Sequence, residues 1–186
     1  TGGAAVAANR LMDALNNNGV KAKMLVQNKE SENITVANLP HNHYLKFLWE
    51  RWCIYCHLHF CKKHLWDIDI ANTGTDITKL REFKEADIIH LSWINHGMLS
   101  LKNIKKILQC GKPVVWTMHD LWPATGICHY ARGCTHFYLT CQHCPLLPNS
   151  GSDHDISNRI WYKKQALFNT GSIYVVACSK WLKHHA

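Results

Sequence analysis

The stretch from residue 112 to residue 145, KPVVWTMHDLWPATGICHYARGCTHFYLTCQHCP, constrains the fold more than any other part of the chain. It begins with a short β-branched and aromatic run, residues 113–118, between Gly111 and a polar break. Such a run predicts a strand that is buried on both faces, as in a parallel sheet. His119 and Asp120 follow at its carboxyl end, where open α/β sheets bind their ligands, so the pair is a candidate site. On position alone, a turn cap and a loop histidine explain the pair equally well.

Four cysteines follow in the same stretch with the spacing C-x5-C-x6-C-x2-C. Four thiolates in one irregular loop suit a tetrahedral zinc ion, and the last two cysteines have the spacing of structural zinc sites. Two disulfides would order such a loop as well as a metal does. Nine cysteines are an odd number and no signal peptide is visible, which favours a reducing compartment and therefore zinc. The expected ligands are Cys128, Cys134, Cys141 and Cys144, and one of them could be replaced by His129, His136 or His143.

The rest of the chain alternates between helical and strand-like patterns at the intervals of βαβ units. We expect helices over residues 4–15, 76–84, 101–108 and 155–169, and strands over residues 20–27, 86–91 and 173–177. This order predicts an α/β fold with a doubly wound, Rossmann-like parallel sheet. Trp93 and Asn95 follow the strand at 86–91, so they should lie at the same edge of the sheet as His119. A length of 186 residues suits one domain.

Gly2 and Gly3 stand immediately before the first helix. A glycine pair in this position lets backbone N–H groups approach an anion, helped by the helix dipole, although an ordinary glycine turn explains it too. The formal charge of +8 suits a phosphate-bearing ligand, an anionic membrane or a nucleic acid, and it does not choose among them.

Residues 43–66, HYLKFLWERWCIYCHLHFCKKHLW, combine apolar side chains near helical spacing with lysine and arginine. This composition fits an interfacial helix on an anionic membrane. An amphipathic helix that packs against the domain explains the same pattern, and it is the interpretation we prefer. No apolar run reaches the roughly 18 residues that are needed to span a bilayer.

Several of these motifs occur together in one family. The composite consists of a strand, then HD-WP-TG, then a cysteine-bearing loop that ends in C-x2-CP, with three further segments, GGAAVAANRLMDAL at the front, ADIIHLSWINHGMLSL at 86–101 and ACSKWL at 177–182. In this the chain resembles the amino-terminal half of bacterial glycosyltransferases of family 4, which are retaining enzymes of the GT-B type. The resemblance covers nearly the whole chain, and residues 29–75 match only vaguely.

The resemblance implies that residues 1–186 are the acceptor-side, Rossmann-like domain of such an enzyme, with a cysteine-rich loop at 119–152. Its first strand and the donor-binding half would then be absent from the chain, and the chain alone would be inactive. The whole enzyme would transfer a sugar from a UDP- or GDP-linked donor to a glycan or lipid-linked acceptor in polysaccharide biosynthesis, usually without a catalytic metal.

The resemblance also assigns roles to single residues. His119 would lie against the donor sugar and its phosphates, and Asp120 would orient it. Gly2 and Gly3 would border the leaving group. The acceptor pocket would be shaped by Trp93, Asn95 and Trp122.

Two further expectations concern location and class. The protein is expected in the cytoplasm, with peripheral contact to the inner face of the membrane through residues 43–66. The alternative function is a zinc-stabilised binding module for nucleic acid or a protein partner. Against it, the basic residues are dispersed along the chain, and the glycine pair would have no role.

Overall fold

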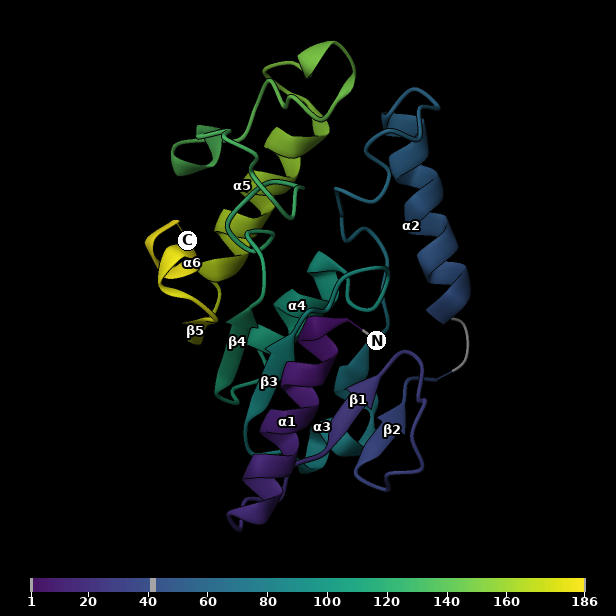
Figure 1. The fold of residues 1–186 in the computed structure, drawn as a ribbon, viewed down its shortest axis with the longest axis vertical. Helices are drawn as coiled ribbons and strands as arrows, with labels where there is room; N and C mark the ends of the chain where they lie inside the picture. Colours follow the sequence, from purple (N-terminus) through teal and green to yellow (C-terminus); the bar gives the residue numbers. More distant parts are fainter. Residues whose placement is uncertain (1, 41–42, 186) are drawn as a thin grey trace.

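The computed structural model describes residues 2–40 and 43–185, and its centre is a three-stranded parallel sheet. The strands are β3 (Ile89–Ser92), β4 (Val114–Met118) and β5 (Ile173–Ala177), in that spatial order. Ile89 pairs with Val114, and Val114 pairs with Ile173. All three run parallel, as the alternation of apolar segments predicts. Figure 1 shows their carboxyl ends directed towards the loops that precede α5.

The crossover helices pack on one face of this sheet. α4 (Leu101–Leu108) connects β3 to β4, and α5 (Ile156–Phe168) connects β4 to β5. Ile104 and Ile107 of α4 and Leu167 of α5 join Val114 and Trp116 in the main hydrophobic core. Burial of these apolar side chains is the main force that holds the helices on the sheet.

Both crossover helices begin directly after a residue whose side chain caps them, Ser100 for α4 and Asp155 for α5. The Ser100 hydroxyl accepts from the backbone N–H of Asn103 at 3.1 Å, and the Asn103 side chain accepts from the Ser100 backbone at 3.0 Å, which completes a capping box. Asp155 accepts from the backbone N–H of Asn158 at 3.0 Å at the start of α5.

A second, two-stranded parallel sheet consists of β1 (Met24–Val26) and β2 (Val36–Asn38). It follows α1 (Gly3–Asn17), and β1 is shorter than the strand predicted at 20–27. The residues before it are used to end the helix, because Val20 N–H bonds to the Leu15 carbonyl at 2.9 Å. Ala22 N–H likewise bonds to the Asn16 side chain at 2.9 Å.

The prediction that β4 is buried on both faces was wrong for one face. Trp116 and Met118 are buried, whereas Val115 and Thr117 are only half-buried. The cause is that α4 and α5 cover only the face on which Trp116 lies. β5 is at the edge and leaves Tyr174, among others, in solvent.

α2 (His43–His57) is shorter than the helix expected over 43–66, because His59 and Phe60 adopt positive φ angles that cannot continue an α-helix. Its buried residues are Glu50, Arg51 and Ile54. The remaining described helices are short: η1 (Ile77–Lys79), α3 (Arg81–Glu85) and α6 (Lys180–His185), with η2 (His136–Tyr138) and η3 (Pro148–Ser150) between β4 and α5. Among the described helices, none combines the length and the apolar character that crossing a membrane requires.

Candidate functional site

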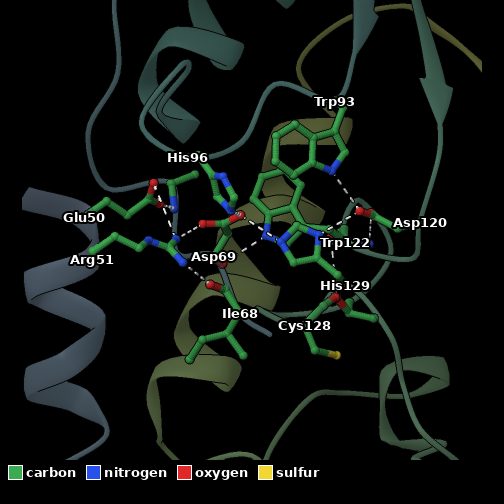
Figure 2. Close-up of polar contacts among 12 residues, drawn as sticks. Glu50, Arg51, Ile68, Asp69, Trp93, His96, Asp120, Trp122, Cys128 and His129 are labelled. Atoms are coloured by element: carbon green, nitrogen blue, oxygen red, sulfur yellow. Dashed lines mark hydrogen bonds and ion pairs between the residues drawn. The ribbon is translucent and has the colours of Figure 1, made fainter. Parts of the chain in front are cut away.

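A buried network of charged side chains lies beyond the carboxyl ends of β3 and β4, and Asp69 is at its centre (Figure 2). The Asp69 backbone N–H bonds to the Ile127 carbonyl at 2.8 Å, and Ile68 forms an antiparallel bridge with Cys128. These contacts attach the segment around Asp69 to the cysteine-bearing loop. Asp69 was not predicted as a site residue, because it lies in a stretch of sequence without a recognisable pattern.

Asp69 is fully buried and is paired with two cationic side chains. It accepts a hydrogen bond from the Arg51 guanidinium of α2, and its other oxygen lies 2.7 Å from His129 Nε2. Arg51 also donates to the carbonyl of Leu65 at 2.8 Å and to that of Ile68 at 3.2 Å. The guanidinium therefore connects α2 to the segment that carries Asp69.

His129 bridges two carboxylates. Its Nδ1 lies 2.7 Å from Asp120, and its Nε2 lies 2.7 Å from Asp69. Burial alone would lower the pKa of His129, but the hydrogen bonds and charges of Asp120 and Asp69 outweigh it and raise this pKa to about 9. At neutral pH both ring nitrogens are therefore protonated, and each donates to one carboxylate.

Asp120 makes two further contacts. It accepts from the backbone N–H of Trp122 at 2.9 Å and from the indole N–H of Trp93 at 3.2 Å. Burial alone would raise the pKa of Asp120, but the hydrogen bond from His129 leads the contacts that lower it overall. Asp120 thus caps the turn that follows β4 and also connects Trp93 to the buried network.

His119 does not share this network, although it precedes Asp120 in the chain. Its Nε2 lies 2.8 Å from the Ser92 hydroxyl at the end of β3. Burial lowers the pKa of His119, with Asp120 opposing the shift, so the half-buried ring is neutral at pH 7. A neutral imidazole beside a hydroxyl can donate or accept one hydrogen bond to a ligand at this edge of the sheet.

The residues expected around the acceptor lie at different depths. The Trp93 ring is half-buried and meets the His96 ring edge-on at 4.7 Å between centroids. Trp122 is 1 % exposed and donates from its indole to the Asp69 carbonyl at 2.9 Å, so it supports the network from the core. Asn95 is buried as well.

Gly2 and Gly3 are both exposed. Gly2 is the residue before α1, and its carbonyl accepts from the Val6 backbone N–H at 3.2 Å. Figure 1 draws the first turn of α1 on the same side of the sheet as the carboxyl ends of β3 and β4. The structure thus brings His119, Asp120 and Trp93 to one edge and places the glycine pair on the same side.

The network contains a group of side chains whose spacing would allow a metal ion. Within residues 2–40 and 43–185, Asp69, His96 and His129 form the one group of three whose ligand atoms all lie within 4.8 Å of one another. In this structure Asp69 pairs with Arg51, and His129 bridges Asp69 and Asp120. These side chains are therefore engaged with one another as an ion-pair network.

The four cysteines of the loop line one small pocket together with Ile127 and Phe137: they are Cys128, Cys134, Cys141 and Cys144. All four are free thiols. Burial raises the pKa of Cys141 to about 12 and that of Cys144 to about 11, so both are protonated at neutral pH without a bound cation.

Comparison with known proteins finds one partial match of note. Over 65 residues the chain is 35 % identical to a protein of Escherichia coli (strain K12) described as a putative colanic acid biosynthesis glycosyl transferase, WcaC. The match covers 33 % of this chain and 16 % of that protein, so the chain corresponds to a small part of its relative. No family model matches, and no solved structure matches. The similarity relates the chain to a glycosyltransferase over a third of its length.

Proposed function

We propose that the chain is the acceptor-side domain of a retaining GT-B glycosyltransferase of family 4 that uses a nucleotide-sugar donor. The observation that carries the proposal is the 35 % identity to a protein described as a glycosyl transferase. The parallel sheet supports it, because such sheets bind ligands at the carboxyl ends of their strands, where His119 and Asp120 lie.

In this proposal His119 contacts the donor sugar directly. Its neutral ring is half-buried and fixed by Ser92, so it can hold one hydrogen bond in a defined direction. Asp120 acts as a positioning residue, because its carboxylate is committed to His129, to Trp93 and to a backbone N–H. Trp93 is then the aromatic side chain at the acceptor side.

The charges of the buried network decide what it can contribute. Arg51 and His129 are positively charged, and Asp69 and Asp120 are negatively charged. The net charge of these four side chains is therefore close to zero. Such a cluster fixes geometry and does not by itself stabilise a departing diphosphate. The phosphates would then rely on N–H groups at Gly2 and Gly3 and on a second Rossmann-like half that binds the UDP or GDP moiety.

Peripheral membrane contact through α2 belongs to the same proposal, since a lipid-linked acceptor is presented at a membrane. α2 packs on the domain through Glu50, Arg51 and the apolar Ile54, and it leaves a second apolar face in solvent. Arg51 points inward, so the positive charge near this face comes instead from exposed lysines in the turn after the helix, Lys62 and Lys63. The exposed face consists of Tyr44, Leu45, Leu48, Trp49 and Trp52, each at least 43 % exposed. Tryptophan beside lysine favours the headgroup region of an anionic bilayer.

The membrane contact is tested by co-sedimentation with vesicles that contain an anionic phospholipid. Replacing Trp49 and Trp52 by alanine should abolish binding, and added salt should weaken binding of the unchanged protein. Trp181→Ala is the matched control, because this tryptophan is 58 % exposed on α6, outside the proposed face. Equal sedimentation of all three proteins would refute the contact.

The catalytic proposal is tested in the full-length protein with labelled UDP- and GDP-sugars. His119→Ala should lower transfer about 100-fold or more, the usual cost of removing a hydrogen bond to the reacting group. His154→Ala, at an exposed turn, should leave transfer unchanged. Transfer that survives His119→Ala would remove this residue from the site. Binding of nucleic acid without any sugar transfer would favour the alternative, a zinc-stabilised binding module.

A further inference from the structure

The cysteine pocket has no part in the sugar chemistry proposed above, and it includes two buried thiols. Cys141 and Cys144 are each 8 % exposed, and their side chains face the same space as those of Cys128 and Cys134. The space measures about 20 Å³, which is room for one water molecule or one ion. Its other walls are largely apolar, so a water molecule there would find few partners.

Backbone contacts hold the cysteines around this space. The Gly126 N–H donates to the Cys141 sulfur at 3.1 Å. The Asn158 side chain donates to the Cys141 carbonyl at 3.0 Å, and the Cys144 N–H donates to Asp155 at 3.1 Å. Two of the cysteines are thereby fixed on the first turn of α5. The Cys128 backbone is held by its bridge to Ile68.

Lys164 of α5 is the second, independent observation. It is 2 % exposed, and its ammonium group donates to the carbonyls of Trp122 at 2.6 Å and Thr125 at 3.1 Å. Its nitrogen also lies 3.4 Å from the centre of the Trp122 ring. Within the described residues it forms no salt bridge, and a buried cation without a counter-charge is costly. Burial lowers the pKa of Lys164 to about 7. Thr125, whose carbonyl it contacts, directly precedes Gly126, whose N–H donates to the Cys141 sulfur, so Lys164 lies next to the cysteine pocket.

We propose that Cys128, Cys134, Cys141 and Cys144 bind one structural Zn²⁺ ion, and that Lys164 supplies part of the counter-charge. Each thiol gives its proton to solvent when it binds, so four thiolates and one Zn²⁺ carry a net charge of −2. The nearby ammonium group reduces this charge, and the thiolates provide the anionic partner that Lys164 otherwise lacks. No three of the four sulfurs lie within 4.8 Å of one another, so the pocket would have to contract to bind the ion.

The metal would also act on the network described above. His129 follows Cys128 directly, and its ring must stay between Asp69 and Asp120. A ligand bond at Cys128 restricts the backbone of His129 and so maintains the position of both carboxylates. This role is structural, and it does not depend on the proposed transferase activity.

The test begins with the chain purified without added metal. Elemental analysis should give about one equivalent of zinc. Cobalt substitution should give the absorption bands of tetrahedral thiolate coordination. Cys141→Ser and Cys144→Ser should lose the metal, whereas Cys56→Ser and Cys178→Ser should keep it, because these two cysteines are exposed elsewhere on the surface.

Two measurements keep the proposal testable if a cysteine variant fails to fold. In the unchanged protein, alkylation followed by mass mapping should find four protected thiols, which become reactive when a chelator removes the metal. Lys164→Met should lose zinc to a competing chelator about tenfold more readily, the usual cost of removing an outer partner of a metal site. Absence of metal, disulfides among the four cysteines in fresh lysate, or full metal retention in Cys141→Ser would overturn the proposal.

Discussion

Asp69→Asn is the most informative single change, because this carboxylate supports both α2 and the loop of His129. The substitution keeps the size of the side chain and removes its charge. Arg51 is 6 % exposed and His129 is also buried, so neither can turn to water when their shared partner becomes neutral. Arg51 keeps two backbone carbonyls, and His129 keeps Asp120.

The size of the effect follows from these remaining contacts. Removing one partner of a buried ion pair costs about 3–5 kcal/mol. Here Glu50 can compensate in part. Burial, followed by the charge of Asp69, raises the pKa of Glu50 to about 7, so loss of Asp69 favours its ionisation. The Glu50 carboxylate lies 3.9 Å from Arg51 and would take over part of the pairing. We therefore expect the free energy of unfolding to fall by about 3 kcal/mol, the lower end of that range.

The assay is urea denaturation at pH 7, with Asp67→Asn as the matched control. Asp67 is half-buried and pairs with His64 and Arg132, each at 2.7 Å. Partly solvated pairs of this kind contribute about 0–1 kcal/mol. The double variant Arg51→Met, Asp69→Leu should recover much of the lost stability, because it leaves no unpaired charge. Equal losses at Asp67 and Asp69, or a loss below about 1 kcal/mol at Asp69, would refute the reasoning.

Three further predictions concern other parts of the chain. Between pH 4.5 and about 7, Glu50 keeps a proton in the folded protein that it has released in the unfolded chain, so the free energy of unfolding should fall as pH rises through this window. Urea denaturation midpoints measured across this range should show the fall, and they should change less in Glu50→Gln. Gly126→Ala should lower the thermal midpoint clearly, because the new Cβ would clash with the Ser157 carbonyl and crowd the Cys141 side chain. Gly133→Ala meets no atom, so it should show only the smaller cost of placing alanine at a positive φ. Calorimetric titration of UDP- and GDP-sugars into the 186-residue chain should show weak or no binding, and tight binding would place the donor site within this domain.

The elements of the central sheet could be predicted because their signals are local. β4, α4 and α5 were each marked by an apolar run or by a cap within a few residues, and the observed bounds agree within about two residues. The place of His119 and Asp120 at the end of β4 followed from the same signals. The partners of these two residues could not be predicted. Successive residues at a strand end point in different directions, so His119 contacts Ser92 whereas Asp120 contacts His129.

What only the tertiary structure decided are the contacts between distant segments. Asp69 is 60 residues from His129 and 18 residues from Arg51 in the sequence. No local sequence pattern predicts ion pairs between residues at such separations. Periodicity could not decide which side of α2 is buried, because its inner side combines Ile54 with the charged Glu50 and Arg51, while its aromatic side faces solvent. Periodicity assumes that apolar side chains point inward. Here a buried carboxylate from another segment places the charged Arg51 on the inner side beside Ile54, since a buried guanidinium needs a counter-charge and Asp69 supplies it.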